Sequence, residues 1–452
     1  MVLRSINPFS GEVIEEFPED STGKIDVLIQ ESSKAFEDWK RTKFDYRSSL
    51  LKKVSSLLLD NTGEFARPIT MEMGKPITES GAEVKKCAWV CDYYAENGEN
   101  FLKAETVVSD ADESYVFCEP LGTILGIMPW NFPFWQVFRF AVPALMAGNT
   151  ILLKHSSNVQ ICARNIERIF TEAGFPEGVF RNLAIGSERV KEVIENDIIK
   201  AVSLTGSSQA GQKVAAIAGN KTKKVLLELG GSNAFVVLDD ADVELAVATG
   251  VRARMMNGGQ SCIAAKRFIV HQDISKRFIE LFAEKIKTIQ TGDPMDAITE
   301  MGPLSSIKQA EEVEKQMLLS VEMGAKLKVG GSRDRAFFPP VLMTEVRPGM
   351  PVFDEEVFGP VAPVIVARDT DEAISLANNT KYGLGVTLFT RDIERAKRLV
   401  PEFPDGAVFI NELVKSDPRL PFGGTKQSGF GRELSAQGIR EFVNIKTVYI
   451  RK

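Results

Sequence analysis

A nearly uncharged segment, GIMPWNFPFWQVFRFAVPALMAG at residues 126–148, limits the fold of this chain more than any other part of its sequence. The segment is long enough to cross a bilayer, which takes about 20 apolar residues. It contains three prolines, however, and each removes a helix hydrogen bond or disfavours helical geometry in the residue before it. A lipid-exposed span tolerates such breaks poorly. The segment therefore predicts a buried strand, a turn at PWNFP and a buried helix.

Strand and helix patterns alternate along the rest of the sequence. Apolar side chains recur at helical spacing in residues 24–39, 45–60 and 76–100, and short β-rich runs begin near residues 150 and 200. The alternation restarts after residue 262, and a chain of 452 residues exceeds what one core usually holds. These patterns predict an α/β protein with two domains.

Composition excludes several classes of protein. The net charge of −6 argues against a nucleic-acid partner, which a basic face would attract. His155 and His271 are the only histidines and no Cys/His cluster exists, so we expect no metal site. The five cysteines form no CxxC pair and the N-terminus has no apolar leader segment. We therefore expect free thiols and a cytoplasmic protein without a membrane association.

The last residues, NIKTVYI at 444–450, have the pattern of a strand without a local partner. We expect this strand to pair either with ESYVFCEP at 113–120 or with the sheet edge of another subunit.

Three short motifs carry side chains suited to chemistry. They are PWNFP with Asn131, VLLELGGSN with Glu228, and NGGQSCIAAKR with Cys262. Each also has an ordinary interpretation when taken alone, because Asn131 could simply form the turn, Glu228 could be a solvated charge and Cys262 a passive thiol.

Together with EEVFGPV at 355–361 and PFGGTKQSGFGRE at 421–433, these motifs resemble the aldehyde dehydrogenase superfamily over essentially the whole chain. The likeness is strongest to bacterial succinate-semialdehyde dehydrogenases. It implies an aldehyde dehydrogenase-like α/β fold with two Rossmann-like domains and a small β arm that makes a homodimer or homotetramer. The implied boundaries are residues 1–102 and 121–229 for the dinucleotide-binding domain, 230–428 for the catalytic domain, and 103–120 and 429–452 for the oligomerisation and bridging segments.

The resemblance also implies a catalytic role for each motif. A Cys262 thiolate would add to the aldehyde carbon, which must become tetrahedral before it can lose a hydride. The side-chain amide of Asn131 and the backbone N–H of Cys262 would stabilise the resulting oxyanion. Glu228 would activate the water that hydrolyses the thioester. His155 has no evident link to Cys262, so a Cys–His hydrolase is not favoured. A thiol esterase or acyl-transfer enzyme, and a binding protein on an inactive scaffold, remain the alternatives.

The cofactor-binding residues are predicted in part from a GxxxxG spacing. In TGSSQAG, Gly206 and Ser207 precede a predicted helix whose first amides could bind a pyrophosphate. By resemblance, Glu356 and Phe358 contact the nicotinamide ribose, Lys154 contacts the adenosine ribose, and Pro129 and Trp130 complete the site.

One position in the KHSSN segment bears on cofactor choice. Relatives that prefer NAD often have a glutamate three residues after the lysine, where this sequence has Ser157. A small neutral side chain leaves room for a 2′-phosphate, and Lys154 adds a positive charge. We therefore expect NADP to be preferred and NAD to be a weaker alternative.

Arg139 is the sequence's main indication of the substrate. It is the only charge in the apolar segment and lies eight residues after Asn131, so it needs a partner. That partner is either a substrate carboxylate, which favours succinate semialdehyde, or a buried acidic side chain. Ser416 and Arg419 precede PFGG and could reach the same tunnel.

The pocket departs from the family pattern at one place. Met255 and Met256 stand where some succinate-semialdehyde enzymes have a second arginine. These flexible apolar side chains keep other small aldehydes, such as lactaldehyde, glycolaldehyde and glutarate semialdehyde, open as substrates.

Overall fold

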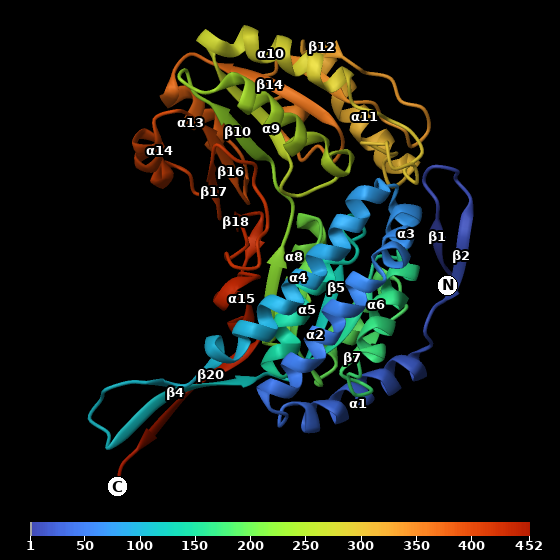
Figure 1. Ribbon diagram of the computed structural model, residues 1–452, viewed down its shortest axis with the longest axis vertical. Coiled ribbons are helices and arrows are strands. Elements are labelled where there is room, and N and C mark those ends of the chain that lie inside the picture. The colour runs from blue at the N-terminus through green and yellow to red at the C-terminus, as the bar shows by residue number, and fades with distance from the viewer. Residues whose placement is uncertain (1) are drawn as a thin grey trace.

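The computed structural model describes residues 2–452 and contains two large sheets and a projecting arm (Figure 1). The first sheet has six strands in the order β19-β9-β8-β5-β6-β7, and every pairing except that of β19 is parallel. Its strands are β5 (Thr123–Met128), β6 (Thr150–His155), β7 (Phe180–Asn182), β8 (Ile199–Thr205), β9 (Lys224–Glu228) and β19 (Gly429–Phe430).

Helices from the first half of the chain cover this sheet. They are α1 (Thr22–Trp39), α2 (Phe44–Asp60), α3 (Thr62–Met73), α4 (Ile77–Leu102), α5 (Trp135–Ala147), α6 (Gln160–Glu172), α7 (Val190–Glu195) and α8 (Ser208–Asn220). The hairpin β1 (Val2–Ile6) and β2 (Val13–Pro18) lies at the edge of this half, beside α6. The periodicity that predicted helices at 24–39, 45–60 and 76–100 is confirmed by α1, α2 and α4.

The second sheet has seven strands in the order β12-β13-β14-β11-β10-β16-β17. Its strands are β10 (Asn233–Val237), β11 (Ala265–His271), β12 (Lys326–Val329), β13 (Val341–Thr344), β14 (Val361–Ala367), β16 (Val386–Phe389) and β17 (Val408–Ile410). Its helices are α9 (Val243–Met255), α10 (Gln272–Lys287), α11 (Ile307–Glu322), α12 (Pro351–Asp354), α13 (Thr370–Asn378) and α14 (Ile393–Leu399). The two sheets confirm the predicted α/β class.

The arm consists of β3 (Glu105–Thr106), β4 (Glu113–Pro120) and β20 (Val443–Ile450), and it projects away from both sheets (Figure 1). Strands β4 and β20 are antiparallel over their full length, from Val443 opposite Pro120 to Ile450 opposite Glu113. This register confirms the first of the two partners expected for the C-terminal strand, a segment of the same chain.

The apolar segment at 126–148 forms the end of β5, a turn, and the whole of α5, in which every residue is buried. Strand β5 and helix α5 approach so closely that a Cβ on Gly126 would lie 2.2 Å from the Phe140 ring. No helix within residues 2–452 is both long and apolar enough to span a membrane. The segment is therefore the core of the first half of the molecule.

The end of the chain differs from the predicted domain boundaries. The oligomerisation and bridging segment predicted at residues 429–452 does not lie wholly in the arm, because β19 pairs with β9 of the first sheet and α15 (Ser435–Arg440) packs against α4 and α5. Within residues 429–452, only β20 belongs to the arm. The short β18 (Thr425–Lys426), which pairs with β15 (Tyr382–Gly383), precedes β19, so the chain returns to the first sheet near residue 429. Sequence patterns missed this return because β19 has only two residues.

Candidate active site

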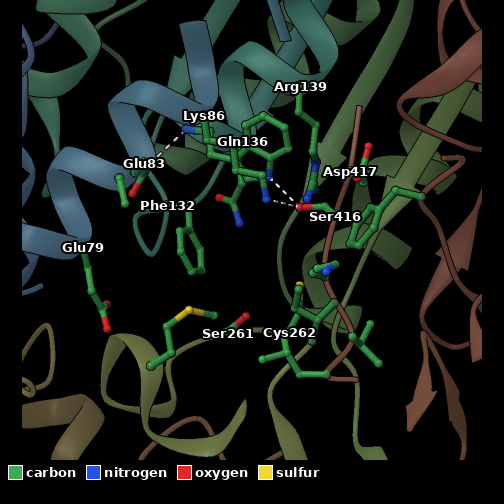
Figure 2. A pocket seen from close by; sticks show the side chains of 18 of the residues that line it. Glu79, Glu83, Lys86, Phe132, Gln136, Arg139, Ser261, Cys262, Ser416 and Asp417 are labelled. Atoms are coloured by element: carbon green, nitrogen blue, oxygen red, sulfur yellow. Dashed lines mark hydrogen bonds between the residues drawn. The ribbon is translucent and has the colours of Figure 1, made fainter. Parts of the chain in front are cut away.

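Two cavities meet at Cys262. The first, which we name cavity 1, has a volume of about 480 Å³ and lies between α4, α5 and residues 413–422 (Figure 2). The second, cavity 2, has a volume of about 300 Å³ and lies between the PWNFP turn, the start of α8 and residues 356–358. Cys262 and Gln136 line both cavities, so a molecule in either one reaches the thiol.

The loop that carries Cys262 depends on left-handed backbone. Asn257, Gly258 and Gly259 have φ angles of 54°, 58° and 73°. At Gly259 a Cβ would lie 2.4 Å from the carbonyl oxygen of Gly359, so any other residue would push the loop away from the β14 side. The glycines of NGGQSC thus fix the direction in which the chain delivers Cys262 to the cavities.

A buried lysine lies directly behind the thiol. Lys266 donates hydrogen bonds of 2.8 Å to the carbonyl oxygens of Ser261 and Cys262, and its ammonium lies 3.1 Å from the Glu356 carboxylate. Burial raises the pKa of the Cys262 thiol to about 11, against the opposing effect of the positive charges of Arg139 and Lys266. The thiol is therefore protonated at neutral pH in the ligand-free protein.

Asn131 is held by three hydrogen bonds, two to the Cys262 loop and one to helix α5. Its Nδ2 donates to the carbonyl oxygen of Gln260 (2.9 Å), its Oδ1 accepts from Gln136 (3.0 Å), and its backbone carbonyl accepts from Asn257 (2.8 Å). The second Nδ2 hydrogen has no protein acceptor among residues 2–452. The sequence analysis missed Gln136, although a lone amide five residues after Asn131 in an apolar helix was a usable signal.

His155 holds the turn that carries Asn131. Its Nε2 donates to the carbonyl oxygen of Pro133 (2.8 Å), and its Nδ1 accepts from the backbone N–H of Ser156 (2.9 Å). Complete burial lowers the pKa of His155 to about 4, and the charge of Lys154 acts in the same direction. His155 is thus a neutral structural anchor, which sequence reasoning had left without a role.

Glu228 ends β9 and is buried, and neither carboxyl oxygen has a hydrogen-bond partner within the described chain. Burial raises its pKa well above the usual range, and the neighbouring Glu433 raises it further, whereas Arg139 and Arg432 oppose the shift. Glu228 does not line either cavity, but it is close enough to Cys262 to raise the thiol pKa.

Arg139 has the second of the two partners that the sequence allowed. It lines cavity 1, but its Nε forms a buried ion pair with Glu433, and Nη2 donates to the hydroxyl of Thr205 (3.2 Å). The guanidinium also lies 4.7 Å from the centre of the Phe422 ring. Because Glu433 already neutralises this charge, the structure does not support Arg139 as the main anchor of a substrate carboxylate.

Ser416 lies in cavity 1 as expected, next to a residue that the sequence analysis did not identify. The Ser416 hydroxyl accepts hydrogen bonds from the Lys86 ammonium (2.8 Å) and from the Trp135 indole (3.0 Å). Arg419 also lines cavity 1, but it is exposed and pairs with Asp417 (2.7 Å). Lys86 lies within the predicted helix 76–100, where nothing in the pattern separates it from a surface lysine.

The residues of cavity 2 fit a nicotinamide dinucleotide. Glu356 accepts from the backbone N–H of Gly231 (3.0 Å) through Oε1, and its Oε2 fills the space over Gly230, where a Cβ would lie 2.2 Å from it. Trp130 and Phe358 form an edge-to-face pair with centres 5.8 Å apart. A carboxylate oxygen beside an aromatic wall is suited to a ribose hydroxyl and a flat ring.

The start of α8 supplies the phosphate-binding part of the same cavity. Gly206 and Ser207 line cavity 2, and Ser207 caps the helix by accepting from the N–H of Ala210 (3.2 Å). The other first-turn amides face a site where an anion is stabilised by the helix dipole.

The remaining predicted cofactor residues divide into two groups. Pro129 lines cavity 2, whereas Lys154 and Ser157 do not. Ser157 lines a neighbouring cavity of about 950 Å³ that shares Trp130 with cavity 2. Lys154 is buried in β6, and this burial lowers its pKa. A dinucleotide in cavity 2 must therefore extend beyond it to reach these two side chains.

Residues 1–448 match the sequence model of the aldehyde dehydrogenase family. The chain belongs to this family. A probable NADP(+) succinate-semialdehyde dehydrogenase of Synechocystis sp. is 44% identical over 453 residues, which cover 100% of both chains. The NAD(P)+ succinate semialdehyde dehydrogenase Sad of Escherichia coli K12 is 44% identical over 448 residues, or 98% of this chain and 97% of the relative.

The solved structures give the same result for the fold. The crystal structure of succinic semialdehyde dehydrogenase from Streptococcus pyogenes in complex with NADP+ is 36% identical and has a TM-score of 0.97, with 100% of both chains covered. The fold class expected from the motifs is therefore confirmed. The whole chain has the aldehyde dehydrogenase fold.

Proposed function

We propose that this aldehyde dehydrogenase oxidises succinate semialdehyde to succinate and prefers NADP to NAD. The observation that carries the proposal is the meeting of cavities 1 and 2 at Cys262, because cavity 2 suits the nicotinamide end of a dinucleotide and cavity 1 admits a short aldehyde. The names of the Synechocystis and Escherichia coli relatives and the bound NADP+ of the Streptococcus pyogenes enzyme support the same substrate and cofactor.

The first chemical step is an addition to the aldehyde. The Cys262 thiol first loses its proton to water, and the resulting thiolate attacks the carbonyl carbon, whose oxygen becomes an oxyanion. The free Nδ2 hydrogen of Asn131 and the backbone N–H of Cys262 donate to that oxyanion. Asn131 is pre-oriented by Gln136 and Gln260, so little reorganisation is needed during the step.

The later steps divide between the cofactor and Glu228. Glu356, Phe358 and the start of α8 would hold a dinucleotide, which would supply the hydride acceptor when bound; loss of the hydride from the adduct would leave a thioester on Cys262. Glu228 then takes a proton from water, the water oxygen adds to the thioester carbon, and the C–S bond breaks to release the acid. Burial raises the pKa of Glu228, so its deprotonated carboxylate is a stronger base than an exposed one and is suited to accept that proton.

NADP preference rests on the turn after β6. Ser157 is small and neutral, and Lys154 lies three residues before it, so a 2′-phosphate meets no negative side chain from this turn.

Cavity 1 could also hold a slightly longer substrate. Apolar side chains such as Phe132, Trp135 and Met256 line much of cavity 1, which would also admit glutarate semialdehyde with one more methylene. Uncharged aldehydes would lack a partner for the cations that line the same cavity.

A kinetic grid tests the proposal. Succinate semialdehyde, glutarate semialdehyde, lactaldehyde, glycolaldehyde and acetaldehyde would each be assayed at 340 nm with NAD and with NADP. We expect the highest kcat/KM for succinate semialdehyde with NADP. Equal kcat/KM for acetaldehyde would overturn the substrate, and product formation without any dinucleotide would favour the thiol esterase alternative.

We further infer a homodimer or homotetramer in a reducing, cytoplasmic compartment. The arm exposes large apolar side chains at Val108, Ile445 and Tyr449, which a partner subunit would cover. All five cysteines are free, and Cys262 must stay reduced to act. Light scattering at several protein concentrations would contradict the oligomer if only a monomer were found.

A further inference from the structure

The Ser416 hydroxyl is arranged as a donor into cavity 1. It is 6% exposed and accepts hydrogen bonds from both Lys86 and Trp135. A hydroxyl has two lone pairs and one proton, so two accepted bonds leave only the proton to be placed. None of the described residues accepts that proton. A buried O–H without a partner is costly unless a ligand supplies the acceptor.

Lys86 presents a positive charge beside the same hydroxyl. Its ammonium uses one N–H for Ser416 and lies 4.2 Å from the centre of the Trp135 ring, so two N–H groups remain. The described part of the chain forms no ion pair with it. Burial, with a further contribution from the charge of Arg139, lowers the pKa of Lys86 to about 8.

The carboxylates nearest to Lys86 are already paired with other cations. Glu83 forms a buried ion pair with Lys75, and Asp417 pairs with Arg419 (2.7 Å). Lys86 is therefore a half-buried cation of cavity 1 without a counter-ion within residues 2–452. Figure 2 shows it near Ser416, in the lining of the same cavity as Cys262.

We propose that Lys86 and Ser416 together bind the distal carboxylate of the substrate, so that Lys86 provides the selection for a semialdehyde acid that Arg139 does not provide. The Ser416 O–H and the two remaining Lys86 N–H groups donate to the carboxylate oxygens, while Cys262 lines the same cavity and meets the aldehyde end. This inference deepens the proposed function and rests on it.

The test compares charged and uncharged substrates in two variants. Lys86→Met keeps an unbranched chain against Trp135 but removes the charge, and Lys86→Arg retains it. Lys85→Met is the matched control, because Lys85 is the neighbouring lysine of α4 but is exposed and lines neither cavity. Each enzyme would be assayed with succinate semialdehyde and with butanal, an aldehyde of the same length without the carboxylate.

We expect Lys86→Met to lower kcat/KM for succinate semialdehyde by about 10- to 100-fold. The change should be in KM, with kcat nearly unchanged, because Lys86 would bind the distal carboxylate equally strongly in the ground state and in the transition state. Butanal should be affected less than about threefold, and Lys86→Arg should retain most of the preference. Lys85→Met should behave as wild type.

The contrary outcomes are distinguishable. If Lys86→Met lowered kcat/KM equally for both aldehydes, its role would be structural and the inference wrong. If the variant kept the wild-type preference for succinate semialdehyde, the proposed function would stand without Lys86. If wild type itself did not prefer succinate semialdehyde to butanal, the proposed substrate would fail first.

Discussion

The Lys266 ammonium donates a 2.8 Å hydrogen bond to the carbonyl oxygen of Cys262 and lies 3.1 Å from the Glu356 carboxylate. A single buried cation thus joins the backbone of the predicted nucleophile to the side chain that we expect to bind the cofactor ribose. Its charge also lowers the pKa of the thiol, which burial would otherwise raise further.

Replacing Lys266 should make Cys262 less reactive. In wild type without dinucleotide, alkylation by iodoacetamide should rise about tenfold per pH unit between pH 8 and pH 10, because the thiol pKa is about 11 and only the thiolate reacts. Lys266→Met should be alkylated roughly tenfold more slowly at pH 9. Peptide mass spectrometry of the Cys262 fragment measures both rates, and the exposed Lys326→Met is the control. Equal rates would show that Lys266 only supports the loop.

Removing the Glu228 carboxylate should separate oxidation from hydrolysis. In Glu228→Gln the thioester should form but break down slowly, so kcat should fall by about 100-fold or more. Stopped-flow absorbance at 340 nm should still show a rapid burst of about one reduced cofactor per site. In wild type, the hydrolysis rate should rise with pH, because burial holds the pKa of Glu228 well above its usual range and only the deprotonated form accepts a proton. A variant without a burst would assign Glu228 to an earlier step.

Cofactor choice should respond to the turn after β6. Ser157→Glu places a carboxylate where a 2′-phosphate would lie, so the ratio of kcat/KM for NADP to that for NAD should fall by at least about tenfold, or about 1.4 kcal/mol. Ser157→Gln matches the size without the charge and should change the ratio less. If Ser157→Glu left the ratio unchanged, Ser157 would not contact the adenosine ribose.

His155 should make the protein sensitive to mild acid. Its pKa is about 4 in the folded state and near 6.5 when unfolded, so the unfolded state binds a proton first as the pH falls. The stabilisation is complete above pH 6.5 and is lost progressively towards pH 4. The loss reaches about 2 kcal/mol at pH 5.

Urea unfolding at a fixed protein concentration checks this dependence. The difference in unfolding free energy between wild type and His155→Gln should shrink by about 2 kcal/mol from pH 7 to pH 5. A difference that does not change with pH would mean that His155 is not neutral in the native state.

The sequence predicted features that depend on neighbours along the chain. The turns and loops at PWNFP, LELGG and NGGQSC are each specified by a few adjacent residues, and apolar side chains at helical spacing predict the helices α1, α2 and α4. The pairing of β20 with β4 could also be anticipated, because both are isolated strands of the same length.

Features that depend on distant contacts could not be predicted. The partner of Arg139 is Glu433, almost 300 residues later, and no local pattern links them. Lys86 resembles any surface lysine until α4 places it beside Ser416, which lies 330 residues away. His155 gained its role only when the fold placed Pro133 against its ring.

The return of the chain to the first sheet has a consequence for synthesis of the protein. Strand β19 pairs with β9 at Glu228, and Glu433 supplies the counter-charge of Arg139. Glu228 and Arg139 therefore gain these neighbours only when the last part of the polypeptide has been made. A nascent chain that has passed Cys262 already contains the nucleophile but not the segment that completes the surroundings of Glu228. We therefore expect aldehyde-oxidising activity only after nearly the whole chain has been made, because truncated products would contain Cys262, Asn131 and Glu228 but lack β19 and Glu433.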